Sequence, residues 1–272
     1  MIYDTHTHST NSDGRQSVDE MCLSAIEKGV RGIALTDHAD MNFYEERNTL
    51  QRMTQSISDI GVAKEKYKGK LDVFCGVELG EYLYAPENAK KILNLTKYDV
   101  ILCSVHYLPQ ARWPQPYNRI PFHEDITDEE LTEYLRLYFQ LLSQTIDAFD
   151  FDVLAHITCP VRYMTGRYER VTDVMMFEDQ IREVLKKIID RNIALEFNTG
   201  GLYEKLHYCN IQNEEIFPLY KSLGGRLITL GSDAHSTGSV ANQFDHTIAQ
   251  LKSYGFDAYH YYENRIAKEI KI

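Results

Sequence analysis

Seven short apolar runs, each leading to a histidine, aspartate or glutamate, constrain how this chain can fold. The runs are rich in β-branched residues, which favours strands. Side chains so far apart in the sequence can meet only where parallel strands end at a common rim, as they do in barrels of alternating strands and helices. The runs are Ile2–Thr5 before His6 and His8, Gly32–Leu35 before His38, Val73–Val77 before Glu78, Val100–Val105 before His106, Phe151–Leu154 before His156, Ile193–Leu195 before Glu196, and Leu227–Leu230 before Asp233 and His235.

Helical patterns separate these runs. Two of the expected helices open with a capping box, Ser17 with Glu20 and Thr127 with Glu130. Strand and helix alternate about seven times, which predicts an α/β fold with a TIM-like closed parallel sheet. Without an internal repeat or a Pro/Gly-rich linker, residues 1–272 are expected to form a single domain. The expected helices cover residues 17–28, 45–67, 127–148, 173–190 and 213–223.

Charge and composition exclude several classes of protein. The net charge of −11 argues against general nucleic-acid binding, which needs clustered Lys and Arg. No apolar run approaches the ~18 residues that span a bilayer, and the N-terminus lacks the pattern of a signal peptide. The five cysteines have no CxxC spacing, so they are expected to be reduced, and the protein cytoplasmic.

Residues 107–126 interrupt the alternation of strand and helix. This segment holds four prolines and several aromatic residues, including Tyr107 and Trp113, directly after His106. Long irregular segments in compact domains are usually functional loops or disordered. The aromatic content favours an ordered loop that shapes the mouth of an active site, although a contact between subunits explains it nearly as well.

Six of the ten histidines and three carboxylates form a pattern of metal ligands. Each motif alone is weak evidence for a metal site, because a single histidine is more often structural. Structural roles do not explain why so many of these residues follow strands. One zinc takes about four ligands, so nine residues predict two or three ions. Mixed imidazole and carboxylate ligands suit zinc, iron or manganese, and clustered ions suit phosphoester hydrolysis. The nine residues are His6, His8, Asp13, His38, Glu78, His106, His156, Asp233 and His235.

The ordered motifs resemble the PHP (polymerase and histidinol phosphatase) superfamily over nearly the whole chain. The resemblance rests on His6-Thr7-His8, Asp13-Gly14, Thr36-Asp37-His38, Gly76-Val77-Glu78, Ser104-Val105-His106, Ala155-His156 and Gly231-Ser232-Asp233-Ala234-His235. It implies a distorted (β/α)7 barrel with three divalent metal ions at the C-terminal ends of the strands. Some members of the superfamily have histidine where this chain has Asp13. The implied ligands are His6, His8, Glu78 and Asp233 for the first metal, Asp13, His38 and His235 for the second, and His106 and His156 for the third, with Glu78 bridging.

Within the superfamily, the chain length and the aromatic insert look most like histidinol-phosphate phosphatase. Such an enzyme converts L-histidinol phosphate, a small phosphorylated substrate, to L-histidinol and phosphate. Glu78 and Asp233 are then catalytic through the metals, and Asp37 is expected to transfer a proton or to orient a histidine ligand. Residues expected near substrate are Arg162, Arg167 and Arg15 for the phosphate, Tyr107 and Trp113 for stacking, and Glu81, Glu196 and Asn198 as polar partners. Solvent-facing arginines would fit the same positions equally well.

Three other functions fit the sequence. One is a PHP phosphoesterase that acts on nucleotides or short oligonucleotides, and another is a phosphotyrosine protein phosphatase. The third is a metal-binding module without turnover, which the complete set of nine ligands disfavours. The sequence leaves open the oligomeric state and the metals that are bound.

Overall fold

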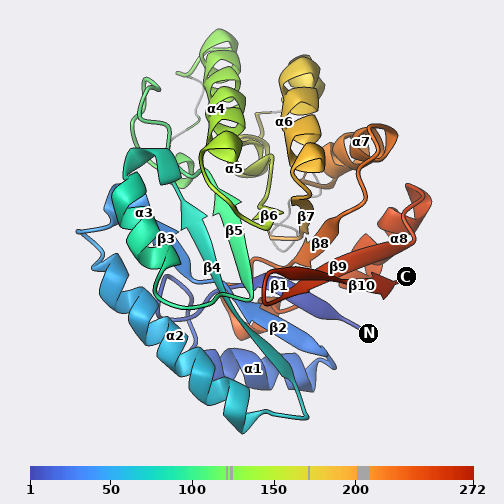
Figure 1. Ribbon diagram of the computed structural model, residues 1–272. Helices are drawn as coiled ribbons and strands as arrows, with labels where there is room; N and C mark the ends of the chain where they lie inside the picture. The colour runs from blue at the N-terminus through green and yellow to red at the C-terminus, as the bar shows by residue number, and fades with distance from the viewer. Residues whose placement is uncertain (121, 123–124, 171, 201–208) are drawn as a thin grey trace.

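Seven parallel strands form a barrel in the computed structural model (Figure 1). The structure describes residues 1–120, 122, 125–170, 172–200 and 209–272, without the side chains of 166, 167 and 209–214. Hydrogen-bonded neighbours follow the order β1-β2-β4-β5-β6-β7-β8, and each pair is parallel. The strands, including three outside this ring, are β1 (Tyr3–Thr7), β2 (Gly32–Leu35), β3 (His38–Asp40), β4 (Asp72–Gly80), β5 (Val100–Ser104), β6 (Val153–Leu154), β7 (Ala194–Asn198), β8 (Ile228–Gly231), β9 (Ala258–Glu263) and β10 (Ile266–Lys271).

The barrel closes between the first and the last of these seven strands. The His8 N–H donates to the Ala234 carbonyl at 2.9 Å, and the Asp233 N–H donates to the His6 carbonyl at 2.8 Å. Both hydrogen bonds lie just beyond or at the C-terminal ends of β1 and β8. They bring the residues that follow the two strands to one rim, so the predicted TIM-like (β/α)7 barrel is confirmed.

A C-terminal hairpin of β9 and β10 packs at the end of the barrel opposite the rim. It pairs with β8 and also contacts β1, where the Tyr261 ring stacks on the Tyr3 ring with centroids 3.9 Å apart. At its tip, the Arg265 N–H donates to the Asp99 carbonyl at 2.8 Å. The Arg265 guanidinium donates to Asp152, just before β6, at 3.1 Å. The hairpin therefore covers the N-terminal ends of the strands, away from the candidate metal ligands.

Helices cover the outside of the barrel, and the two capping boxes are present as predicted, at Ser17 and Thr127. The expected helix 45–67 begins only at Thr49, because Asn48 has a left-handed backbone with φ 51°. Barrel strands such as β2, β5 and β8 are buried along their whole length, since helices cover their outer face. The helices are α1 (Val18–Glu27), α2 (Thr49–Lys66), α3 (Pro86–Leu93), α4 (Asp128–Ala148), α5 (Cys159–Tyr168), α6 (Glu178–Asp190), α7 (Cys209–Ser222) and α8 (Phe244–Ser253).

Short 3-10 helices complete the connections. Most of the predicted irregular segment 107–126 is indeed irregular in its described part, apart from one such turn. The expected helix 173–190 divides into a 3-10 turn followed by α6. Among the helices of the described ranges, none combines the length and the apolarity that a membrane crossing requires. The turns are η1 (Met41–Phe43), η2 (Tyr82–Tyr84), η3 (Tyr117–Arg119), η4 (Val174–Phe177) and η5 (Thr237–Ser239).

Candidate metal centre

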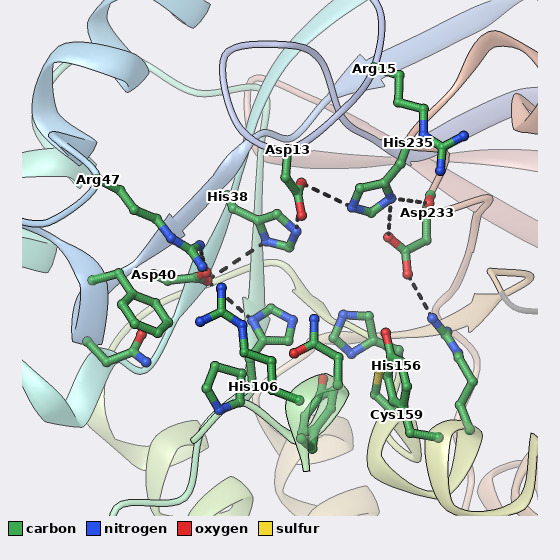
Figure 2. Close-up of a pocket in the computed structure, with 18 residues that line it drawn as sticks. Asp13, Arg15, His38, Asp40, Arg47, His106, His156, Cys159, Asp233 and His235 are labelled. Carbon is green, nitrogen blue, oxygen red and sulfur yellow. Dashed lines mark hydrogen bonds and ion pairs between the residues drawn. The ribbon is translucent and has the colours of Figure 1, made fainter. Parts of the chain in front are cut away.

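A cavity of about 580 Å³ opens at the C-terminal ends of the barrel strands (Figure 2). Its wall combines acidic and imidazole side chains with four arginines, Arg15, Arg47, Arg119 and Arg162. In Figure 2, Asp13, His38, His106 and His156 lie between Arg47 on one side and Arg15 on the other. The cavity thus joins candidate metal ligands to guanidinium groups that suit a phosphate.

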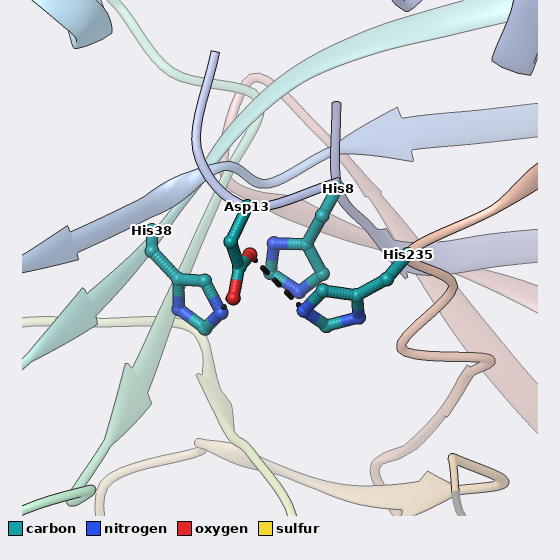
Figure 3. Close-up of side chains that lie close together, drawn as sticks. All are labelled: His8, Asp13, His38 and His235. Carbon is teal, nitrogen blue, oxygen red and sulfur yellow. Dashed lines mark ion pairs between the residues drawn. The ribbon is translucent and has the colours of Figure 1, made fainter. Parts of the chain in front are cut away.

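All nine predicted metal ligands lie in four overlapping groups. Within each group, one ligand atom from every residue lies within 4.8 Å of the others. Figure 3 shows the group in which Asp13 lies among three imidazole rings. The barrel therefore brings together residues from both ends of the sequence. The groups are His8, Asp13, His38 and His235; His6, Glu78 and His156; His6, His8 and Asp233; and His38, Glu78 and His106.

Glu78, at the end of β4, is the centre of the cluster. Its Oε2 lies 2.8 Å from His38 Nδ1 and 3.3 Å from His6 Nε2. Its Oε1 lies 2.8 Å from His156 Nε2 and 3.2 Å from His106 Nε2. One fully buried carboxylate thus has four imidazole nitrogens within 3.3 Å of its two oxygens, the arrangement expected of a carboxylate that bridges ions.

Three imidazoles are oriented by an oxygen acceptor at Nδ1. A proton on Nδ1 leaves the Nε2 lone pair directed at the cluster, which is how histidine ligands of metals are usually held. Glu196 and Asp40 provide two of the acceptors and a main-chain carbonyl provides the third. The pairs are His6 with Glu196 Oε1 at 2.6 Å, His106 with Asp40 Oδ1 at 3.3 Å, and His235 with the Asp233 carbonyl at 2.8 Å.

Atoms without hydrogen bonds indicate that cations fit here. His6 Nε2 and His8 Nε2 lie 3.1 Å apart. With His6 Nδ1–H donating to Glu196 Oε1, a neutral His6 ring would direct its Nε2 lone pair toward His8 Nε2. Glu78 Oε2 is buried, and although His38 Nδ1 lies 2.8 Å away, neither atom has a hydrogen bond of acceptable geometry with a described residue. Buried polar atoms without partners are costly, and a shared divalent cation would satisfy these.

The charges of the cluster are strongly coupled. Burial raises the pKa of the Glu78 carboxyl, but His38, His6 and His106 outweigh burial and hold that pKa well below its usual range. Burial lowers the pKa of His6, yet Glu196 and Glu78 outweigh it and hold that pKa well above its usual range. The carboxylates are therefore ionised and ready to bind cations.

Backbone geometry at the rim is unusual. Asp233 and His156 have φ values of 53° and 23°, a left-handed region that residues with a side chain rarely adopt. At Gly231, an added Cβ would lie against Glu196 Oε1 and 2.7 Å from His6 Cβ. Such strain concentrates at functional sites, where the surrounding structure enforces it.

Two of the predicted phosphate-binding arginines, Arg162 and Arg15, line the cavity. Arg162 lies on helix α5, not in the loop where it was expected, and donates to Asp233 at 3.0 Å and Asn198 at 2.5 Å. Arg167 is also on α5, but its side chain lies outside the described residues.

An aromatic residue of the insert lines the cavity, but it is neither of the two that were expected to stack on the substrate. Tyr107 does not line the cavity, and its backbone N–H donates to Glu81 Oε1 at 3.1 Å. Trp113 is also absent from the lining. Tyr117 lines the cavity instead, and its ring lies 5.4 Å from that of Tyr163. The insert does reach the mouth, as expected, but through the 3-10 turn η3.

The role predicted for Asp37 needs correction. This buried carboxylate accepts hydrogen bonds from the Ser9 N–H at 2.7 Å, the Ser12 hydroxyl at 2.7 Å and the Ser56 hydroxyl at 2.6 Å. Among the described residues it has no hydrogen bond or ion pair with a ligand imidazole, and it does not line the cavity, so its contacts support neither predicted role. Its contacts fix the loop that carries Asp13.

Asp40 and Arg47 were missed by the sequence reasoning. Asp40 accepts from Arg47 Nη1 at 2.8 Å and lies beside His106, and both residues line the cavity. A signal for Asp40 did exist, because it stands two positions after His38 and side chains alternate along a strand. No comparable pattern pointed to Arg47.

Comparisons with known proteins agree with this geometry. The PHP domain model matches residues 4–200. A "Probable histidinol-phosphatase" of Clostridium acetobutylicum is 28% identical over 98% of this chain and 99% of its own, and one of Thermotoga maritima is 26% identical over 94% of each. The crystal structure of histidinol phosphate phosphatase from Lactococcus lactis, complexed with zinc, L-histidinol and phosphate, has a TM-score of 0.80 with 20% identity over 98% of both chains. This chain therefore belongs to the PHP domain family.

Proposed function

We propose that this chain hydrolyses L-histidinol phosphate to L-histidinol and phosphate with the help of divalent metal ions. The observation that carries the proposal is the placement of Arg162 against Asp233, which puts a guanidinium suited to a phosphate next to a candidate metal ligand. The names of the two curated relatives and the ligands of the Lactococcus structure support this choice of substrate.

The nine residues would hold three ions of zinc, iron or manganese. His6, His8, Glu78 and Asp233 would bind the first ion, Asp13, His38 and His235 the second, and Glu78, His106 and His156 the third. When bound, such ions neutralise the charge of a phosphate and make a water molecule more acidic. Two groups of converging ligand atoms overlap the first and second sets, and His8 is close enough to join the second as well. For the third set, Glu78 Oε1 lies 2.8 Å from His156 Nε2 and 3.2 Å from His106 Nε2.

The other side chains of the cavity would bind and orient the substrate. Arg162 is held by Asp233 and Asn198, and its guanidinium would donate to a phosphate oxygen. Arg15 lines the same cavity and has no carboxylate partner among the described residues. The rings of Tyr117 and Tyr163 offer an apolar wall against which the imidazole of histidinol would pack.

A nucleotide is the second candidate substrate, and one observation favours it. Like Arg15, Arg119 is exposed at the cavity and has no carboxylate partner in the described part of the chain. A substrate with several phosphates would use more guanidinium groups than histidinol phosphate, which carries a single phosphate.

The two candidates are separated by an assay of phosphate release. Protein reconstituted with zinc, iron or manganese would be given histidinol phosphate, nucleoside mono- and triphosphates, a phosphotyrosine peptide and a dinucleotide. We expect the highest kcat/KM for histidinol phosphate, and no activity in a Glu78→Gln variant. A preference for nucleotides by more than about tenfold, ~1.4 kcal/mol in transition-state free energy, would overturn the choice of substrate.

A further inference from the structure

A second cavity, of about 290 Å³, adjoins the candidate metal centre. It shares Asp13, His38, Asp40 and Arg47 with the main cavity. Its remaining wall comes from a different part of the chain, the loop before α1 and the first turn of α2. The residues that line only this second cavity are Ser12, Thr49 and Arg52.

The charge of the second cavity favours an anion. Arg47 and Arg52 both line it. Arg52 has no carboxylate partner among the described residues and donates through Nη1 to the Ser12 carbonyl at 3.0 Å, which leaves further N–H groups available. Asp40 is paired with Arg47 at 2.8 Å, and Asp13 belongs to the candidate metal centre, where bound cations would offset its charge.

Thr49 presents an unused hydroxyl in this cavity. The residue is only 3% exposed, it lines the cavity, and its hydroxyl makes no hydrogen bond with a described residue. Thr49 is also the first residue of α2, an 18-residue helix with no side-chain cap and no acidic residue in its first turn. No residue in the first turn of the helix therefore offsets the positive end of its dipole.

We propose that this second cavity is an oxyanion subsite that binds a phosphate group beside the metal centre. Arg47 and Arg52 supply charged donors and Thr49 supplies a hydroxyl donor. Because Arg47 lines both cavities, it contacts an anion in either one. The oxyanion is either product phosphate or a second acidic group of the substrate. The choice between these two sources rests on the function proposed above, whereas the subsite itself does not.

Binding of inorganic phosphate tests the subsite directly. Equilibrium dialysis of metal-loaded protein with radiolabelled phosphate should give two phosphates per chain. Arg52→Gln and Thr49→Val should each weaken the second phosphate by at least about tenfold, because each removes a hydrogen-bond donor. Arg52→Lys, which retains the charge, should weaken it less. Arg226→Gln, an exposed arginine before the N-terminal end of β8, is the matched control and should retain both phosphates.

The proposal would be overturned if the wild-type protein bound a single phosphate. It would also be overturned if Arg52→Gln and Thr49→Val bound two phosphates as well as wild type. Steady-state kinetics distinguish the two possible sources of the bound oxyanion. If product phosphate enters, inhibition by phosphate has a noncompetitive part that Arg52→Gln removes. If a second acidic group enters, Arg52→Gln lowers kcat/KM for a bisphosphate more than for a monophosphate. If the protein binds two phosphates but does not hydrolyse histidinol phosphate, the proposed subsite stands and only the proposed function is wrong.

Discussion

Arg162 donates from Nη1 to Asp233 Oδ2 at 3.0 Å, so a guanidinium on α5 lies against a carboxylate of the candidate metal centre. Its Nη2 donates to Asn198 at 2.5 Å. These two contacts hold the guanidinium at the cavity wall, where its positive charge can attract a phosphate. The side chain is therefore placed before the substrate arrives.

Arg162→Ala should raise KM for a phosphomonoester by about 10- to 100-fold, because a charged hydrogen bond contributes ~1.5–3 kcal/mol. Arg162→Lys retains the charge but loses the planar pair of donors, so its KM should lie between those of Ala and wild type. Steady-state kinetics with metal-loaded protein measure both variants. An unchanged KM in Arg162→Ala would remove this residue from the substrate site.

Glu196→Gln should weaken metal binding by about 10- to 100-fold, because groups that orient histidine ligands have effects of this size. Glu196 Oε1 lies 2.6 Å from His6 Nδ1, and neither side chain is exposed to solvent. Competition with a chromogenic chelator measures the affinity without any assay of turnover. Glu133→Gln, which changes an exposed glutamate on α4, should bind metal like wild type. Equal affinities in the two variants would show that Glu196 does not orient the His6 ring.

The sequence was informative for the residues that face the cluster and less so for the residues behind them. Alternation along parallel strands determines where His6, His38 and Glu78 point, so their convergence could be predicted. The partners of these residues depend on the direction of each side chain in the folded protein. The periodicity of the sequence does not determine that direction. Asp37 and Asp40 both follow β2 closely, yet Asp37 contacts serines and Asp40 contacts Arg47.

Short elements escaped prediction for a related reason. Helix α5 has only ten residues, includes a proline and a glycine, and was interpreted as loop, although it carries Arg162. The hairpin of β9 and β10 was also not predicted. Its position depends on tertiary contacts such as that between Arg265 and Asp99, which leave no local pattern in the sequence.

Arg265→Met should lower the free energy of unfolding by about 3 kcal/mol, the cost of leaving a buried charge without its partner. The partner is Asp152, whose side chain is 7% exposed and also accepts from the Ile101 N–H at 2.8 Å. Urea denaturation of the metal-free protein measures the change. The double variant Arg265→Met with Asp152→Asn should recover part of the loss, because the isolated charge is then gone. A loss below ~0.5 kcal/mol in the single variant would contradict the prediction.

His260 should make folding stability depend on pH. Burial lowers the pKa of this imidazole below its usual range, so the folded chain takes up its proton at a lower pH than the unfolded chain. The contribution of His260 to stability is therefore complete above the unfolded pKa of about 6.5 and is lost as the pH falls below it. We expect the difference in unfolding free energy between wild type and His260→Asn to shrink from about pH 7.5 to about pH 5.5. A difference that stays constant over that range would contradict the assignment.

Gly231→Ala should weaken metal binding although it replaces no metal ligand. The added Cβ would lie against Glu196 Oε1 and 2.7 Å from His6 Cβ. The pairing of β8 with β7 limits how far the strand can move away from these atoms. The contact between His6 and Glu196 must therefore open, so we expect metal affinity to fall by at least about tenfold and the free energy of unfolding by ~1–3 kcal/mol. Gly238→Ala is the matched control, because nothing lies within 4 Å of a Cβ at that position. If both alanine variants bind metal as tightly as wild type, then close packing of β8 against the His6–Glu196 pair does not position the ligand.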